Sequence, residues 1–339
     1  MRANAAGIDS ARLAPDLAGF DMDAFLAGLE PRFETALRHT IGLLDPLGPE
    51  DPVSSADGLP RALDEVIAVY RPRYFKLKLC GEVDADLARI RRVARVLDRT
   101  VESYHVTLDG NEQFAAVDDA MALWRSVLAD TDLARFASST LWIEQPLSRD
   151  VAERTDVHAL AALEPVLIDE SDATLDAFPR ARALGYTGVS AKSCKGLYKS
   201  ILNAARCARW NAEGRERFFV SGEDLTTQAG VSLQQDLALA GVLGLSHVER
   251  NGHHYVDGFA GQDASEAEAQ RFLAAHPDLY QPSGAFARVA IRDGTIRFGS
   301  LGAPGYAVVA EPDWSALAPL ESTLAGERHG TTSALGERL

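Results

Sequence analysis

The stretch YFKLKLCG, residues 74–81, places two lysines inside an otherwise apolar run. Successive side chains of a β-strand point to opposite faces, so Lys76 and Lys78 share one face of the predicted strand. The other face is apolar and carries Phe75, Leu77 and Leu79. An antiparallel strand with its lysines in solvent also explains this alternation, and the stretch taken alone favours that simpler interpretation. The rest of the chain favours a different one.

The composition bounds the class of protein. The chain has 339 residues, of which 46% are hydrophobic and 24% charged, as is typical of a globular protein. A formal net charge of −15 argues against nucleic acid or a membrane surface as the main partner. Residues 1–20 lack an apolar core of signal-peptide length, and no later run could span a bilayer. Three cysteines without metal-type spacing (Cys80, Cys194 and Cys207) suit reduced thiols, so we expect a cytoplasmic location.

Short apolar runs alternate with helical patterns between residues 37 and 250. Eight runs are predicted strands: 37–44, 74–79, 104–109, 140–144, 165–169, 187–192, 217–222 and 245–250. The clearest helical segments are 84–98, 118–130, 197–210 and 227–243. This alternation implies parallel strands in a doubly wound sheet or a closed barrel. No glycine-rich phosphate loop follows the first strand, and eight units over about 215 residues predict a TIM-like (β/α) barrel.

A barrel changes the meaning of the two lysines. Both faces of a barrel strand are covered, the outer face by helices and the inner face by the packed interior. Lys76 and Lys78 are then predicted to point inward, near the C-terminal end of their strand. Barrel enzymes build their active sites at that end of the strands.

Charged residues stand at the C-terminal ends of the following predicted strands. Asp109, Glu144 and Asp169 end the third, fourth and fifth strands, and Lys192 ends the sixth. Singly, Asp109 suits a turn, Glu144 a strand end and Asp169 a helix cap, while Lys192 suits a solvated helix face. These separate explanations would all have to apply at once, at residues that end consecutive predicted strands, and one shared site is the simpler explanation. Three converging carboxylates are instead typical of a Mg²⁺ site, because without a cation they would repel one another.

With these motifs the sequence resembles the mandelate racemase/muconate-lactonising family of the enolase superfamily. The motifs are K-x-K at 76–78, D-x-N at 109–111, W-I-E-Q-P at 142–146, D-E-S at 169–171 and the lysine of VSAK at 192. The resemblance covers residues 36–260 and, more weakly, 286–308. It implies a modified barrel that holds one Mg²⁺, or Mn²⁺ in its place.

The resemblance also implies roles for individual residues. Asp109, Glu144 and Asp169 are expected to bind the metal, with Asn111 as a supporting group. Lys78 and Lys192 are expected to act as acid and base on opposite faces of the substrate. Lys76 is expected to help bind the substrate carboxylate and to lower the pKa of Lys78.

These roles fit one chemical step, the removal of a proton α to a carboxylate. The resulting enediolate is dianionic, so a divalent ion and nearby ammonium groups stabilise it. The base must be a neutral amine, which nearby positive charge favours. Two lysines on opposite faces permit racemisation or epimerisation, which we favour. They equally permit elimination by a lyase (dehydratase) or a cycloisomerisation.

The sequence departs from the mandelate-racemase type on the seventh strand, which lacks the base histidine, so the lysine-base type is the better match. The eighth strand lacks the D-x-D of dipeptide epimerases. Arg250 and His253 follow instead and are candidates to bind a polar or anionic substrate group. The roles of Glu223 and Asp224 stay open.

The N-terminal region is short for this family, whose members carry a capping domain before the barrel. We expect a truncated or reduced cap, with a helix at 21–33 as its last element, and a hairpin at Asp293-Gly294 in a segment that would pack on a cap. The expected divisions are 1–36 (cap remnant), 37–260 (barrel), 261–325 (C-terminal segment) and 326–339 (mobile tail). A homo-oligomer acting on a small carboxylate is expected, with no nucleic-acid or membrane partner.

Two interpretations from other classes remain open at this stage. One is a non-catalytic barrel that binds a ligand or partner. The other is an aldolase that forms a Schiff base through Lys192, which leaves the three carboxylates unexplained.

Overall fold

The computed structural model describes residues 10–51, 58–214, 217–225, 227–262, 264–304 and 307–316. Eight parallel strands form a closed barrel, because each strand pairs with the next and β1 also pairs with β8. They are β1 (Glu34–Ile41), β2 (Tyr74–Lys78), β3 (His105–Asp109), β4 (Thr140–Glu144), β5 (Val166–Ile168), β6 (Gly188–Ala191), β7 (Phe219–Gly222) and β8 (His247–Arg250). The predicted TIM-like barrel is confirmed, and each predicted strand overlaps one of these.

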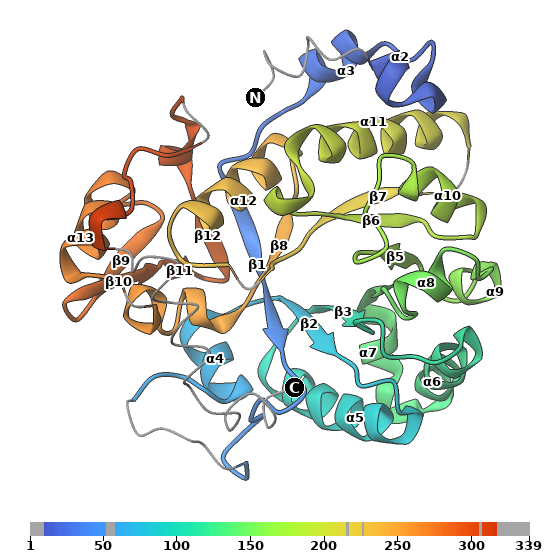
Figure 1. The fold of residues 1–339 in the computed structure, drawn as a ribbon. Coiled ribbons are helices and arrows are strands. Elements are labelled where there is room, and N and C mark those ends of the chain that lie inside the picture. Colours follow the sequence, from blue (N-terminus) through green and yellow to red (C-terminus); the bar gives the residue numbers. More distant parts are fainter. Residues whose placement is uncertain are drawn as a thin grey trace, which may run out of the picture.

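Helices cover the outside of the barrel (Figure 1). They are α4 (Leu63–Tyr70), α5 (Val83–Thr100), α6 (Val117–Ala129), α7 (Ala134–Ser139), α8 (Arg149–Ala152), α9 (His158–Ala161), α10 (Ala177–Ala183), α11 (Leu197–Glu213) and α12 (Val231–Val242). The outward side chains Phe75 and Leu77 of β2 belong to the same buried cluster as Ile90, Val93 and Leu97 of α5. The apolar face of YFKLKL therefore packs on helices, and its lysines point inward as predicted.

The C-terminal end of β2 is tied to the start of α5. The Asp86 carboxylate accepts hydrogen bonds from the backbone N–H groups of Cys80 and Gly81, at 2.8 and 2.9 Å. Gly81 has a φ of 84°, and a Cβ there would lie 2.4 Å from the Gln113 carbonyl oxygen, so this turn requires glycine. The backbone that follows Lys78 is thus held in one path.

The N-terminal segment lies along α11, where α2 (Ser10–Leu13) and α3 (Met22–Gly28) run beside that helix (Figure 1). The Asp16 carboxylate and the Arg206 guanidinium form two hydrogen bonds, of 2.8 and 2.9 Å. The helix predicted at 21–33 ends at Gly28 because Leu29 is extended and Pro31 follows. Its assignment to a cap stays a prediction.

The C-terminal segment adds α13 (Glu266–Ala275), the hairpin β9 (Tyr280–Ser283)–β10 (Phe286–Val289) and the hairpin β11 (Ile291–Arg292)–β12 (Thr295–Arg297). Asp293 and Gly294 both have positive φ, which confirms the predicted turn. β12 pairs antiparallel with β1 and so extends the barrel sheet.

The predicted tail 326–339 lies outside the described residues. No described helix is long and apolar enough to cross a membrane.

Candidate functional site

Lys76 lies at the centre of a buried cluster of charges. Its side chain is 1% exposed, and its ammonium nitrogen lies 2.8 Å from Asp109, 2.9 Å from Glu144, 2.8 Å from Glu223 and 3.0 Å from Glu249. An ammonium has three N–H donors, and hydrogen bonds to Glu144, Glu223 and Glu249 use all of them. Lys76 therefore has no donor left for a substrate carboxylate, which was its expected partner. We call these five residues the deep cluster.

Two members of the deep cluster come from strands whose role the sequence left open or missed. Glu223 follows β7 and is paired with the buried Arg38 of β1. Glu249 lies on β8 and accepts a hydrogen bond of 2.8 Å from the Thr40 hydroxyl. The signal was present in the first predicted strand, where Arg38 and Thr40 share one face, as Lys76 and Lys78 do in the second.

The neighbouring charges within the deep cluster determine which of its groups carry a proton. Burial alone would lower the pKa of Lys76, but Asp109, Glu144 and the two other carboxylates outweigh it and raise that pKa well above its usual value. Burial, together with Asp109 and Glu223, raises the pKa of Glu144. Lys76 is therefore a fixed cation in the barrel interior.

Lys78 lies closer to the mouth of the barrel, with its side chain 25% exposed. Its ammonium nitrogen is 2.7 Å from Asp109 Oδ2. Lys78 and Asp109 are register partners between β2 and β3, and Asp109 and Glu144 between β3 and β4. The backbone N–H of Asn111 donates to Asp109 Oδ1 at 2.9 Å, and its side-chain amide donates to Glu170 at 3.3 Å. The predicted residues of the second, third and fourth strands are thus brought together.

The ends of β5 and β6 carry a second pairing of lysines with a carboxylate. The ammonium nitrogens of Lys192 and Lys195 lie 2.7 and 2.8 Å from the two oxygens of Asp169. Burial would raise the pKa of Asp169, but Lys195 and Lys192 hold it well below its usual range. Burial would lower the pKa of Lys192, but Asp169 outweighs it and raises that pKa. The adjacent carboxylate thus sets the direction of the Lys192 shift, and the expectation that positive charge nearby favours a neutral lysine stays a prediction.

Gln145 fixes the position of Asp169 and was not singled out from the sequence, although it lies within the W-I-E-Q-P motif. Its side-chain oxygen accepts from the backbone N–H groups of Asp169 and Ser171, at 2.8 and 3.1 Å. Its amide nitrogen donates to the Ser171 hydroxyl at 2.7 Å and to the Leu147 carbonyl at 2.8 Å. One buried amide therefore joins the end of β4 to the end of β5.

The sequence contains five lysines, and all of them contact carboxylates in this part of the barrel. The fifth is Lys199, whose ammonium lies 3.1 Å from the Asp172 carboxylate. All the other Lys and Arg residues of the sequence are arginines, which stay charged at any ordinary pH. The lysines thus lie on β2 or between the end of β6 and the first turn of α11.

The donor set suits a hard cation. Asp109, Glu144 and Asp169 supply carboxylate oxygens from three adjacent strands. Glu144 Oε2 is buried without a hydrogen-bond partner among the described residues, as expected of an oxygen that a cation would satisfy. In the described part of the chain, no three His, Cys, Asp or Glu side chains already converge as a metal site. Ammonium groups stand against each of the three carboxylates instead.

The two residues predicted to bind substrate, Arg250 at the end of β8 and His253 after it, lie in different surroundings. Arg250 is 2% exposed, and its guanidinium lies 3.4 Å from both the Asp224 and Asp236 carboxylates. Asp236 also accepts a 2.6 Å hydrogen bond from the backbone N–H of Ser193, next to Lys192. Arg250 thus braces the loop after β6, and its charge is matched within the protein. His253 lines an open cleft and donates to the Thr227 carbonyl at 2.8 Å, if its Nε2 carries the proton.

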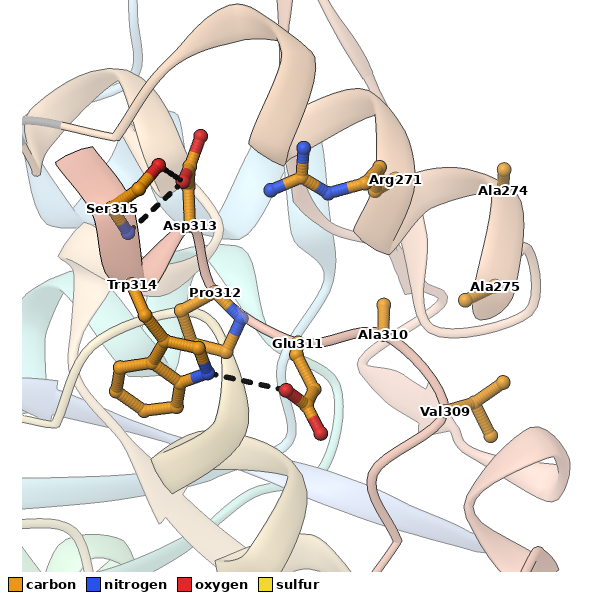
Figure 2. A pocket seen from close by; sticks show the side chains of 10 residues that line it. All are labelled: Arg271, Ala274, Ala275, Val309, Ala310, Glu311, Pro312, Asp313, Trp314 and Ser315. Atoms are coloured by element: carbon orange, nitrogen blue, oxygen red, sulfur yellow. Dashed lines mark hydrogen bonds between the residues drawn. The ribbon is translucent and has the colours of Figure 1, made fainter.

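Among the described residues, two pockets of similar size lie in different places. A cleft of about 800 Å³ is lined by Lys78, His253 and residues of β1 and α4. Another of about 830 Å³ lies between α13 and residues 309–315, where the Trp314 indole N–H donates to Glu311 at 3.2 Å (Figure 2). The second hollow contains none of the predicted site residues. The first reaches Lys78 and is the candidate substrate cleft.

Comparison with known proteins gives matches in structure. No protein-family model and no curated protein matches the sequence. The muconate lactonizing enzyme from Klebsiella pneumoniae is 18% identical, with a TM-score of 0.50 over 81% of this chain and 62% of that chain. A mandelate racemase/muconate lactonizing protein from Paracoccus denitrificans PD1222, complexed with magnesium, is 18% identical, with a TM-score of 0.51 over 81% and 64%. Another structure of that description from the same organism has a TM-score of 0.52 at 18% identity, over 85% and 67%.

These matches establish the fold. The chain has the barrel fold of muconate lactonizing enzymes and mandelate racemase/muconate lactonizing proteins, as the resemblance of its motifs implied. It spans less than two thirds of the length of the first two structures, at 62% and 64%.

Proposed function

We propose that this chain is an enolase-superfamily enzyme of the mandelate racemase/muconate-lactonising type, which removes the proton α to a substrate carboxylate. We favour racemisation or epimerisation as the outcome. The observation that carries this proposal is the placement of Lys78 and Lys192. Lys78 ends β2 and Lys192 follows β6, and these two strands lie four apart in a ring of eight, therefore on opposite sides of the mouth.

Opposite placement lets the two lysines act on the two faces of one α-carbon. One lysine nitrogen takes the proton as the C–H bond breaks, and the bonding electrons pass to the carboxylate as an enediolate. The other lysine, in its ammonium form, returns a proton to the opposite face and inverts the configuration. Lys78 is the more exposed of the two and can exchange its proton with solvent between turnovers.

Asp109, Glu144 and Asp169 are the residues that would hold Mg²⁺ in this proposal. When bound, the ion supplies positive charge to the substrate carboxylate as it becomes dianionic. Lys76 contributes a second fixed positive charge beneath them, which keeps the carboxylates close together despite their mutual repulsion. We assign Lys76 this electrostatic role in place of direct contact with substrate.

Cycloisomerisation is the second candidate, because all three matched structures above carry muconate lactonizing in their names and one of them is a muconate lactonizing enzyme. It begins with related chemistry at the α-carbon, as does elimination by a lyase. A non-catalytic ligand-binding barrel is the alternative from another class. The lysines and carboxylates at the mouth weigh against it, because a binding site has no need for two lysines on opposite faces.

The test is exchange of the α-hydrogen with solvent deuterium across N-acyl amino acids, dipeptides and hydroxy acids, with and without Mg²⁺. We expect Mg²⁺-dependent exchange that, for one enantiomer of the substrate, falls about 100-fold or more in Lys78→Ala. Lys78→Arg is the matched control, because it keeps a positive charge beside Asp109 but cannot act as a base at neutral pH. Exchange of both enantiomers that survives in both variants would show that Lys78 is not a base, and no exchange in a protein that binds Mg²⁺ and these carboxylates would favour the non-catalytic barrel.

A further inference from the structure

Each of the two lysines proposed as acid and base is followed by a backbone segment that binds a buried carboxylate. After Lys78, two consecutive backbone N–H groups donate to Asp86 of α5, at 2.8 and 2.9 Å. After Lys192, the backbone N–H of Ser193 donates to Asp236 of α12, at 2.6 Å. Asp86 and Asp236 are 1% and 4% exposed. Both sides of the barrel mouth thus have a carboxylate of the outer helices that holds the backbone just beyond a lysine.

Asp236 lies where its helix gives no reason for a carboxylate. It stands in the middle of α12, between Leu233 and Leu237, which belong to a buried apolar cluster. Asp86, by contrast, is in the first turn of α5, where the helix dipole favours negative charge. A carboxylate buried among apolar side chains lowers stability unless polar partners satisfy it. The partners of Asp236 therefore have to explain its presence there.

Arg250 balances the charge of Asp236, but the shorter contact of this carboxylate is with the backbone. The Arg250 guanidinium lies 3.4 Å away, which exceeds the roughly 2.8 Å of a charge-assisted hydrogen bond. The bond from the Ser193 N–H is 2.6 Å long. This N–H belongs to the peptide group that joins Lys192 to Ser193, where the 3-10 turn η3 (Ser193–Lys195) begins. Asp236 thus fixes the peptide group directly after Lys192.

We infer that Asp236 is a positioning residue for Lys192 and that Asp86 is a positioning residue for Lys78, so that each carboxylate serves one face of the substrate. The inference rests on the proposed function for the roles of the two lysines. Proton transfer requires the lysine nitrogen within hydrogen-bond distance of the α-hydrogen, and a misplacement of about 1 Å costs up to about 100-fold in rate. Loss of one carboxylate therefore displaces one lysine and leaves the other in place.

The first experiment is reductive methylation of the full chain and of two alanine variants, without added metal, followed by mass spectrometry of the lysine peptides. Asp236→Ala is expected to raise the rate at Lys192 about threefold or more and to leave the rate at Lys78 unchanged, because one lost hydrogen bond frees only one backbone segment. Asp86→Ala is expected to do the reverse, so each variant is the control for the other. Equal changes at both lysines, or at neither, would overturn the inference.

A second substitution at Asp236 separates its contact with the backbone from its contact with Arg250. Asp236→Asn keeps an oxygen for the Ser193 N–H and removes the negative charge, so Lys192 is expected to react at nearly its native rate. Arg250 retains Asp224 at 3.4 Å in both variants, so we expect both to fold. An asparagine variant that changes Lys192 as much as the alanine variant does would contradict the inference, because the bond to Ser193 would then not position the lysine.

The second experiment measures the consequence for proton transfer. It uses the separate enantiomers of whichever N-acyl amino acid, dipeptide or hydroxy acid exchanges its α-hydrogen fastest in the native protein with Mg²⁺. Asp236→Ala is expected to slow exchange about 10-fold for the enantiomer that depends on Lys192 and to leave the other unchanged. Asp86→Ala is expected to slow the enantiomer that depends on Lys78. A merely structural role would slow both enantiomers together and would overturn the inference.

The two experiments separate this inference from the proposed function, because the labelling needs no substrate. Selective changes at one lysine, in a native protein that exchanges none of these compounds, would support the positioning and contradict the proposed function. Exchange in the native protein that falls equally for both enantiomers in each alanine variant would support the proposed function and contradict the positioning.

Discussion

The two lysines of one short strand lie in contrasting surroundings. Lys76 is 1% exposed and contacts four carboxylates, whereas Lys78, two residues later, is 25% exposed and contacts Asp109. Both point into the barrel, so the difference is one of depth. A fully surrounded ammonium is a fixed charge, and a partly open one can exchange its proton. The same residue type thus serves as a structural cation at one level and as a candidate base at the next.

The largest effect is expected from removal of the deep cation. Lys76→Met leaves four buried carboxylates without their shared partner, which predicts a loss of about 3–5 kcal/mol in unfolding free energy at pH 7. Burial and the nearby Asp109 and Glu223 raise the pKa of Glu144, and loss of Lys76 is expected to raise it further, so Glu144 takes up a proton as the pH falls and the deficit becomes smaller. Urea unfolding at pH 5 and pH 7 measures this. Lys78→Met is the control. An equal loss of unfolding free energy in both variants would contradict the view that only Lys76 is a structural cation.

The lysines on opposite sides of the mouth are expected to act on opposite enantiomers. With a pure enantiomer of an active substrate, Lys78→Ala is expected to reduce α-hydrogen exchange about 100-fold for one hand, and Lys192→Ala for the other. The measurement is the rate of proton loss in D₂O for each enantiomer, followed by NMR. If both variants lose exchange with the same enantiomer, the two lysines act on one face of the substrate and inversion is not the reaction.

Metal binding at the mouth is expected to stabilise the folded chain. Mg²⁺ at 100 times its dissociation constant raises the unfolding free energy by about 2.7 kcal/mol. Asp169→Asn is expected to weaken this effect because it removes one of the three charged ligands. Glu164→Gln removes a carboxylate outside the site and serves as the control. Stabilisation that is unchanged in Asp169→Asn would place the ion elsewhere.

The smallest predicted effect concerns the Lys192–Asp169 pair, whose contribution depends on pH. The pKa of Asp169 is held below its ordinary value of 3.8, so its contribution to stability is present above that pH and is lost as the pH falls. The pKa of Lys192 is raised above 10.5, so its contribution is present below that pH and is lost as the pH rises through the raised value. Lys192→Met should therefore lower stability by about 1 kcal/mol between these limits. Denaturant unfolding at pH 3 and pH 7 checks this, and a larger deficit at pH 3 would contradict it.

Sequence patterns could predict the barrel and the half of the site that carries recognisable motifs. The alternation of YFKLKL and the spacing of Asp109, Glu144 and Asp169 depend on local periodicity and strand order, which can be recognised in the sequence alone. The contact of Lys76 with Glu249 joins β2 to β8, and no local pattern shows how deep each side chain lies. Burial of Arg250 depends on Asp236 of α12 in the same way. Depth and pairing across the barrel are set by packing.

The most direct test of this account is competitive labelling of the five lysines of the folded chain by reductive methylation, followed by mass spectrometry of the peptides. The account predicts that Lys78 is modified in the native state and that Lys76 is protected until the chain unfolds in denaturant. Modification of both lysines at similar rates under native conditions would contradict it, because Lys76 would then be neither buried nor fully paired.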